Sequence, residues 1–327
     1  MPSIVRNRHS TTHWGALLLV GAVACSSGEN AADTAAAKSD SAPAAAAPAM
    51  FASAGATDSM KTPESVRYDA DLDAFFVSNI NGNPSQKDGN GFIARVDAAN
   101  TTSVTMFAEG GKNGVTLNAP KGMAIVGDTL WVADIDAMRA FNKRTGARIA
   151  TVDLRPLRAK FLNDVVIGPD GTVYVTDSGL EFDASGNMSH PGPDQIFRLK
   201  GRTPSVAIKA DSGLNGPNGI AWDAANARFV VGPFSSNAIG AWKDGDSTVT
   251  QIATGPGGYD GIEVLSDGRI LVTSWADSGV HAISNGTATK VIANVEGPAD
   301  IGIDTKRNVV ALPRFMAGRV EYFTISR

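Results

Sequence analysis

An internal repeat occupies most of the chain and narrows the fold to repeat architectures. Six segments share one layout: a polar residue, a short alternating strand, a turn and a second strand rich in Val and aromatic residues. Their first residues, which we call the heads, are Glu64, Lys121, Asn163, Asn218, Asp260 and, as a weak example, Ala299. The heads recur roughly every 40 to 58 residues, which is close to the period of four-stranded propeller blades.

The strands and turns inside the repeat agree with an all-β fold. Asp170-Gly171 and Asp267-Gly268 lie between strand-like runs, and Asp-Gly is a strong hairpin signal because both positions must tolerate positive φ. A third strand follows most segments, and no segment shows a sustained 3.6-residue period. We therefore predict one six-bladed β-propeller with four-stranded blades over residues 61–327. Residues of about 50–56 are expected to supply a strand that the last blade lacks.

The amino-terminal part has the features of a lipoprotein signal peptide, predicted over residues 1–24. Its apolar run is too short to span a bilayer, which takes about 20 residues in a helix. The sequence Ala-Val-Ala-Cys, which ends at Cys25, resembles a lipobox, so Cys25 is the predicted lipid acceptor. An incidental thiol in an ordinary signal peptide is the alternative. Residues 25–60, rich in Ala and Ser, are expected to form a flexible linker.

These features predict where the protein resides. A lipid chain on Cys25 would anchor the protein to a membrane surface without spanning it. Ser26 follows the cysteine, and in Gram-negative lipoproteins that choice resembles an outer-membrane address. We therefore expect an exported protein, lipid-anchored in the cell envelope at the periplasmic face of the outer membrane.

Composition and missing motifs exclude several classes of function. A formal net charge of −4 gives no support for nucleic-acid binding. Cys25 is the single cysteine, which excludes an internal disulfide and a Cys-based metal site. The sequence contains no G-x-S-x-G, H-E-x-x-H or G-x-x-x-x-G-K-[ST] motif, so serine-hydrolase, zinc-protease and nucleotide-phosphate sites lack support. We expect a monomer that acts on a small molecule.

Four heads carry oxygen donors that should meet at one end of the propeller. The innermost strand of each blade runs along the central channel, so residues just before these strands converge. Glu64 and Asp260 supply carboxylates, and Asn163 and Asn218 supply amide carbonyls. Such an all-oxygen set suits Ca²⁺, Mg²⁺ or Mn²⁺ better than Zn²⁺. Taken singly, the two Asn residues could instead be turn residues, and Glu64 and Asp260 could be ordinary surface or turn carboxylates.

The same residues give the chain a resemblance to a known family. Four motifs carry it: Glu64 after Pro63, Asn163-Asp164 before VVIGPDG, Asn218-Gly219 before IAW, and Asp260-Gly261. In this order they resemble the metal-binding pattern of the senescence-marker-protein/gluconolactonase/luciferin-regenerating-enzyme family, over about residues 61–327. The resemblance implies a divalent metal held by Glu64, Asn163, Asn218 and Asp260, with Asp260 also serving as base or nucleophile. A wider group of similar propellers hydrolyses organophosphate esters with the same set.

One departure from the family concerns the substrate. Sugar lactonases of the family often have an Arg two residues before the first Asn, and Phe161 occupies that place here. Phe161 therefore argues against gluconolactone and predicts a more apolar ligand wall. Lys121 stays open, because it could face solvent, pair with a carboxylate or attract an anionic group of the substrate.

Other polar and aromatic residues receive secondary roles. Asp164 is expected to orient its loop, Asp300 to be structural, and His190 to be a solvated residue in a long connection that could cover the site. The tryptophans of the blade strands are expected to be core residues; they are Trp131, Trp222 and Trp275.

Together these observations predict a hydrolase of a small lactone or ester that depends on a divalent metal, with Ca²⁺ first and Mg²⁺ or Mn²⁺ as options. The alternative from another class is a non-catalytic propeller, in which a structural ion supports a surface that binds a ligand or partner. A plain repeat scaffold without an ion is the third possibility. Fold alone does not decide among them.

Overall fold

The computed structural model describes residues 51–209 and 213–326. In this part the chain is almost entirely β-structure, with one short 3-10 helix at Arg155–Leu157. None of the described helices is long and apolar enough to cross a membrane. The predicted signal peptide, Cys25 and the linker up to residue 50 lie outside the described residues.

The strands form four sheets of four strands, one sheet of eight strands and one two-stranded hairpin. The first sheet contains β2 (Pro63–Asp69), β3 (Ala74–Asn79), β4 (Phe92–Asp97) and β5 (Val104–Glu109). The second contains β6 (Pro120–Val126), β7 (Thr129–Asp134), β8 (Ala137–Asn142) and β9 (Arg148–Asp153). The third contains β10 (Leu162–Ile167), β11 (Val173–Asp177), β14 (Gln195–Lys200) and β15 (Thr203–Ile208), and the hairpin of β12 (Glu181–Phe182) and β13 (Met188–Ser189) lies in its β11–β14 connection.

The eight-stranded sheet consists of two antiparallel meanders. One is β16 (Pro217–Asp223), β17 (Arg228–Pro233), β18 (Ala238–Trp242) and β19 (Thr250–Thr254). The other is β20 (Tyr259–Val264), β21 (Ile270–Ser274), β22 (Gly279–Ser284) and β23 (Thr287–Ala293). Their outer strands β19 and β23 are joined by the single pair Thr254 and Thr287.

The last sheet joins the two ends of the described chain. It contains β24 (Gly302–Asp304), β25 (Val309–Arg314), β26 (Arg319–Ile325) and, from the other end of the sequence, β1 (Phe51–Thr57). Phe51 is in register with Ile325, and the Thr57 hydroxyl lies 2.8 Å from the Tyr322 hydroxyl. Residues 51–57 of the predicted linker are therefore a strand, at the position where the sequence led us to expect the closing strand.

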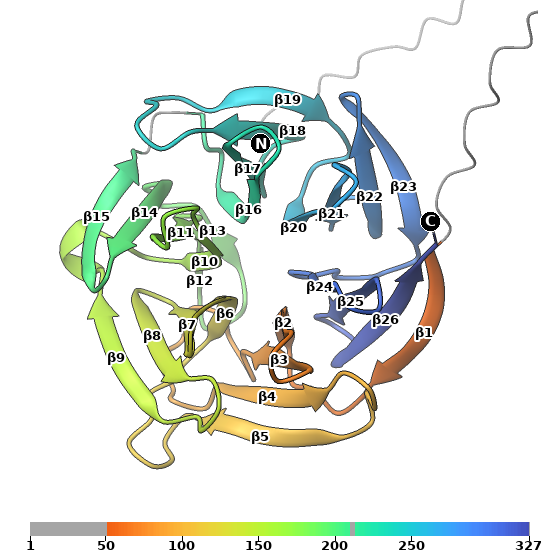
Figure 1. Ribbon diagram of the computed structural model, residues 1–327. Coiled ribbons are helices and arrows are strands. Elements are labelled where there is room, and N and C mark those ends of the chain that lie inside the picture. Colours follow the sequence, from red (N-terminus) through yellow and green to blue (C-terminus); the bar gives the residue numbers. More distant parts are fainter. Residues whose placement is uncertain (1–50, 210–212, 327) are drawn as a thin grey trace, which may run out of the picture. The chain divides into compact units, whose positions relative to one another are not determined.

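The sheets are arranged around a central axis, with the first strand of each meander innermost (Figure 1). Apolar clusters lie between neighbouring sheets and fix these inner strands. Between the third sheet and the next meander, for example, the ring of Phe229 lies 4.5 Å from that of Tyr174 and 5.3 Å from that of Trp242, centroid to centroid. Burying each such ring stabilises the fold by about 2–3 kcal/mol. The fold is thus all-β and propeller-like.

Candidate functional site

Five of the innermost strands have an irregular pairing register near their first residues, where the heads lie. Strands β2, β6, β10, β16 and β20 each shift register against the next strand at the head position. On β20, Tyr259 pairs with Ser274 and Ile262 with Val272, so Asp260 has no partner in the ladder. Such β-bulges bend a strand and redirect a side chain. The heads therefore escape the strict in-and-out alternation of the strands.

Hydroxyl side chains satisfy the backbone groups that three of these bulges leave unpaired. Ser78 accepts a hydrogen bond from the Ser65 backbone N–H at 3.0 Å. In the same way, Thr176 accepts from the Asp164 N–H at 2.9 Å, and Thr273 accepts from the Gly261 N–H at 2.7 Å. A buried N–H without a partner would destabilise the fold, so these hydroxyls hold the bulges in place.

The loops that lead into the heads are tied to the strand beside them. The Asn79 side-chain oxygen accepts from the Lys61 N–H at 2.8 Å, and Asp134 accepts from the Ala119 N–H at 2.9 Å. Asp177 accepts from the Phe161 N–H at 2.8 Å. Each of these polar residues ends the second strand of its sheet. We did not predict a role for them from the sequence, although a polar residue recurs at that position in several of the repeats.

Glycines after two heads allow neighbouring inner strands to approach closely. A Cβ atom on Gly219 would lie 2.3 Å from the Asp260 carbonyl oxygen. On Gly261 it would lie 2.5 Å from the Ile301 nitrogen. Real Cβ atoms do not approach other atoms so closely, because such contacts overlap. These glycines therefore bring heads of adjacent strands to one small volume.

That volume is a cavity of about 540 Å³ at one end of the axis. The predicted ligands Glu64, Asn163, Asn218 and Asp260 all line it, together with Lys121 and Phe161. The sixth head, Ala299, is fully buried and does not line the cavity. The structure thus brings together every site residue predicted for the propeller.

Three of the four predicted ligands have an oxygen atom without a hydrogen-bond partner in the part of the chain that the structure describes. Among the described residues, no hydrogen-bond partner lies near Glu64 Oε2, Asn218 Oδ1 or Asp260 Oδ1, although all three atoms are buried. The other Asp260 oxygen, Oδ2, accepts from the Trp275 indole N–H at 2.8 Å. Buried acceptors without partners cost free energy unless something else binds them. The three oxygens are therefore available to a cation or to a bound molecule.

Burial and the charge of a neighbouring carboxylate raise the pKa of both carboxyl groups in the cavity. Burial, and secondly the charge of Asp260, raise the pKa of Glu64 well above its usual range. Burial, and secondly the charge of Asp300, raise the pKa of Asp260 to about 8. The hydrogen bond from Trp275 acts in the opposite direction on Asp260. A cation bound beside these two carboxyl groups would favour their ionised forms, so the cavity is electrostatically suited to bind positive charge.

Lys121 is an internal cation of this cavity, and it is already engaged. Its Nζ donates to the Pro84 carbonyl at 3.1 Å and to the Ala119 carbonyl at 3.3 Å. The ammonium also lies 4.1 Å from the centroid of the Phe161 ring. Burial lowers the pKa of Lys121 to about 8, although the charge of Glu64 opposes that shift. Of the three possibilities left open by the sequence, exposure to solvent is therefore wrong.

Two further carboxylates lie behind the heads and share one arginine. Asp164 accepts from the Ile220 N–H at 2.8 Å, and Asp300 accepts from the Ser65 hydroxyl at 2.6 Å. The Arg67 guanidinium lies 3.7 Å from Asp164 Oδ1 and 3.5 Å from Asp300 Oδ2. Neither aspartate lines the cavity. Both make hydrogen bonds and ion pairs with protein groups, as expected for residues with a supporting role.

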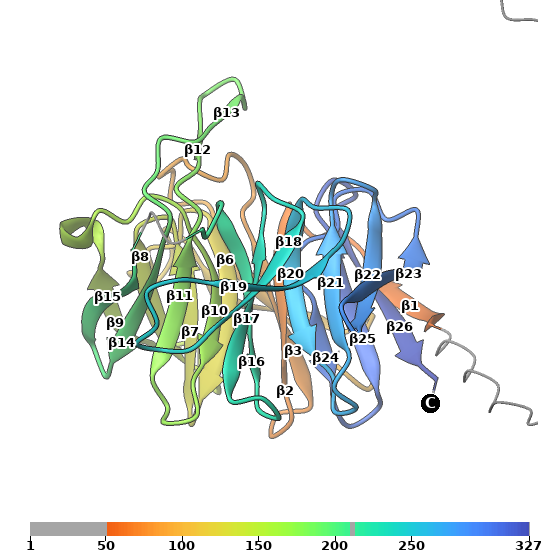
Figure 2. The same cartoon turned by 90° about the horizontal axis from the view of Figure 1, so that it is seen from above.

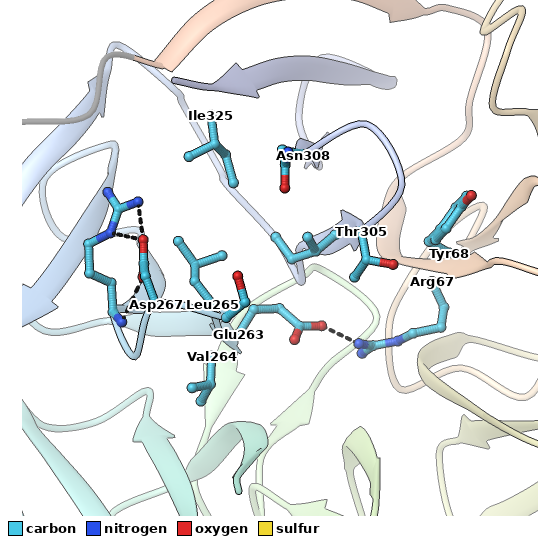
Figure 3. Close-up of a pocket in the computed structure, with 12 residues that line it drawn as sticks. Arg67, Tyr68, Glu263, Val264, Leu265, Asp267, Thr305, Asn308 and Ile325 are labelled. Atoms are coloured by element: carbon cyan, nitrogen blue, oxygen red, sulfur yellow. Dashed lines mark hydrogen bonds and ion pairs between the residues drawn. The ribbon is translucent and has the colours of Figure 1, made fainter. Parts of the chain in front are cut away.

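A second cavity, of about 300 Å³, lies toward the other end of the same inner strands. Arg67 and Glu263 line it, three residues beyond Glu64 on β2 and Asp260 on β20. Figure 3 shows Arg67 and Glu263 pointing at each other, and Asp267 pairs with Arg269. The charged side chains named here for the second cavity are therefore paired with one another. Among the described residues, none of the buried oxygens without a partner belongs to a side chain of this second cavity, whereas three belong to side chains of the first, which we take as the candidate site.

Trp275 corrects one expectation, because it is not a core residue. It directly follows β21, is half-buried, lines the candidate site and donates to Asp260. Trp131 is a core residue as expected, and Trp222 packs against a core cluster. His190 does not line the cavity; its Nε2 lies 2.5 Å from Asp194 Oδ1.

Part of the wall comes from the long connection between β11 and β14. The β12–β13 hairpin projects beyond the end of its sheet (Figure 2). Phe182 and Met188 of the hairpin line the candidate site. Two hydrogen bonds join it to the connection between β3 and β4: Phe182 N–H donates to Ser85 Oγ at 3.0 Å, and the Asn83 amide donates to the Asp183 carbonyl at 2.7 Å.

The donor set is compatible with a hard divalent cation. Over residues 51–209 and 213–326, no three side chains of His, Cys, Asp and Glu form a metal-binding group. A metal held in the cavity would therefore combine the carboxylates of Glu64 and Asp260 with amide oxygens. The free Oδ1 atom of Asn218 meets that requirement. In Asn163, Nδ2 donates to Ser178 Oγ at 3.1 Å, which orients the amide.

Comparisons with known proteins identify a family and a shared fold. Residues 62–303 match the model of the SMP-30/Gluconolactonase/LRE-like region. No curated protein matches the sequence significantly. Regucalcin from Agrobacterium tumefaciens, described as a calcium-binding protein, aligns with 86% of this chain and 96% of its own at 14% identity and a TM-score of 0.63. A gluconolactonase from Xanthomonas campestris aligns with 85% of this chain and 97% of its own at 16% identity and a TM-score of 0.61.

A luciferin-regenerating enzyme shows the same arrangement, with 82% of this chain and 92% of its own aligned at 12% identity and a TM-score of 0.61. At identities this low, the structural similarity demonstrates a shared fold and no more. The family model adds sequence evidence over most of the chain. The chain therefore belongs to the SMP-30/gluconolactonase/luciferin-regenerating-enzyme-like family.

Proposed function

We propose that this chain is a six-bladed propeller that hydrolyses a small lactone or ester with the help of a divalent metal ion. The eight-stranded sheet then counts as two blades, because a single residue pair joins its halves. The observation that carries the proposal is the group of unsatisfied buried oxygens on Glu64, Asn218 and Asp260. Membership of a family that includes gluconolactonases supports a lactonase-type reaction.

The metal would be held by Glu64, Asn163, Asn218 and Asp260. Carboxylate and amide oxygens favour Ca²⁺, with Mg²⁺ and Mn²⁺ as options, over the softer metals that His and Cys prefer. A bound divalent ion would supply Lewis-acid polarisation of the substrate's carbonyl oxygen. It would also balance the negative charge of the two carboxylates, whose pKa values burial and repulsion raise.

Asp260 is the proposed catalytic residue. The Trp275 N–H holds Oδ2 at 2.8 Å, while the buried Oδ1 has no partner among the described residues. The free oxygen can take a proton from a water molecule that attacks the carbonyl carbon and displaces the alcohol oxygen of the ester. Alternatively, it can attack that carbon itself, displace the alcohol oxygen and form an acyl-enzyme that water then hydrolyses. Trp275 acts as a positioning residue in either route, because it fixes the orientation of the carboxyl group.

The experiment is a panel of small lactones, aryl esters and one phosphotriester, incubated with the purified chain with and without Ca²⁺, Mg²⁺ or Mn²⁺. We expect turnover that needs the metal and falls at least 1,000-fold in Asp260→Asn. The matched control is Asp267→Asn, which removes an exposed carboxylate at the far end of the same hairpin. Metal binding without turnover on any substrate would refute the hydrolase and favour a ligand-binding propeller with a structural ion.

A second proposal concerns location. The predicted signal peptide and Cys25 imply export and lipid anchoring in the cell envelope. An anchored hydrolase would meet small molecules on the outer side of the cytoplasmic membrane.

A further inference from the structure

The walls of the candidate site differ from its floor in chemical character. The floor holds the four predicted ligands and Lys121, and the walls hold mainly apolar side chains. These are Ile80, Phe161, Leu180, Phe182, Met188, Phe234, Trp275, Phe315 and Met316. A cavity of about 540 Å³ also exceeds what a bare five-membered lactone needs, since sites of this size hold drug-sized ligands.

One side of the wall is an aromatic arc built from equivalent positions of three consecutive repeats. Phe234 directly follows β17, Trp275 follows β21 and Phe315 follows β25. The centroid of the Trp275 ring lies 6.1 Å from that of Phe234 and 5.4 Å from that of Phe315. The three rings therefore form one continuous apolar surface from blade to blade.

The other side of the wall comes from Phe161 and the hairpin. The rings of Phe161 and Phe182 lie 5.7 Å apart, centroid to centroid. Two polar side chains near this side are already engaged: Asn83 Oδ1 accepts from the Ser85 N–H at 2.9 Å, and Lys121 of the floor is bound to two backbone carbonyls. A ligand with several hydroxyl groups would lose its water here and gain few hydrogen bonds in return.

The rim of the site exposes two methionines. Met316 has 65% and Met188 has 51% of its surface exposed, and both line the cavity. Exposed Met side chains at a cavity mouth are adaptable apolar contacts for a ligand that extends toward solvent. The apolar surface of the walls thus continues to the rim of the cavity.

We propose that the substrate is a lactone or ester whose reacting carbonyl group is attached to an alkyl chain of several carbons. The carbonyl lies at the floor, near Asp260, and the chain runs between the aromatic arc and Phe182 toward Met316. This proposal rests on the proposed function for the reaction and adds the class of substrate. A polyhydroxylated sugar lactone does not fit the same wall.

The test separates binding from hydrolysis. The probes are γ-lactams with ethyl, butyl, hexyl and octyl chains, which the enzyme cannot hydrolyse as it would the lactone, and gluconolactam as the polar comparison. Binding is measured by isothermal titration calorimetry on the full chain at saturating Ca²⁺. We expect the affinity to rise about fourfold for each added methylene until the chain passes the rim, with gluconolactam at least 100-fold weaker than the hexyl probe.

Two methionine variants provide a matched pair. Met316→Ala should weaken octyl-lactam binding by about three- to tenfold and leave the ethyl probe unchanged. Met106→Ala, at a similarly exposed methionine that lines a different groove, should change neither. An affinity that does not depend on chain length, or tighter binding of gluconolactam, would overturn the substrate class even if lactones are hydrolysed. Length-dependent binding without hydrolysis of any lactone would instead uphold the alkyl site and refute the proposed reaction.

Discussion

Replacing Asp260 by Asn should have opposite effects on stability in the absence and in the presence of metal. The pKa of Asp260 is raised to about 8 in the folded protein, whereas an aspartate in an unfolded chain ionises near pH 4. Between these values the unfolded chain releases a proton that the metal-free folded protein keeps, so a rise in pH favours unfolding. For one group the loss is about 1.4 kcal/mol per pH unit. The metal-free protein should therefore lose stability from about pH 5 to pH 8.

Asn keeps the size of the side chain and removes the ionisable group. At pH 7 the metal-free variant should be more stable than the metal-free wild type, by up to about 4 kcal/mol. With saturating Ca²⁺ the order should reverse. A metal that binds the folded state stabilises it, and the variant lacks one of the proposed ligands, Asp260.

Urea unfolding followed by tryptophan fluorescence measures both effects, at pH 5, 6, 7 and 8, after chelation and with saturating Ca²⁺. Asp267→Asn serves as the control, because a hydrogen bond from Arg269 lowers the pKa of Asp267 and its neutralisation should not stabilise the protein. Metal-free wild-type stability that stays constant or rises from pH 5 to pH 8 would refute the reasoning. So would a metal-free Asp260→Asn variant that is less stable than the wild type at pH 7.

Trp275→Phe keeps an aromatic ring but loses the N–H that holds Asp260, so steady-state assays should show kcat lowered about 10- to 100-fold and KM changed less than threefold. An unchanged kcat would exclude the positioning role. Gly261→Ala should lower the free energy of unfolding by about 1–3 kcal/mol or more in thermal denaturation, because its Cβ would overlap the Ile301 nitrogen; unchanged stability would show that the strands can separate. Cys25→Ala should abolish incorporation of labelled fatty acid in cells, and retained labelling would place the lipid elsewhere.

The repeat predicted the fold and the floor of the site, because both depend on period and position. Glu64, Asn163, Asn218 and Asp260 occupy equivalent places in their repeats, so a radial fold must bring them to one end of its axis. The closing strand β1 was also predictable in outline, since the last repeat lacked a fourth strand. Spacing along the chain was sufficient for these inferences.

The walls were not predictable in the same way. Trp275 has the large apolar side chain that is typical of a core residue. Its place in the cavity wall depends on the direction in which the chain leaves β21. The hydrogen bonds from Asn83 and to Ser85 join two connections about 100 residues apart in sequence, and no periodic pattern reports such a contact. Lys121 was left open because its two carbonyl partners are backbone groups.

The bulges at the heads also bear on how such a propeller can change over evolutionary time. Asp260 and the equivalent heads lie at bulges, outside the regular strand pairing. Replacing one of them therefore alters the cavity without removing a pair of residues from the sheet. The apolar residues that pack between the blades, such as Ile262, occupy other positions of the same strands. Selection can therefore exchange the reactive groups while the ring stays intact, and one architecture can diversify its chemistry without first being rebuilt.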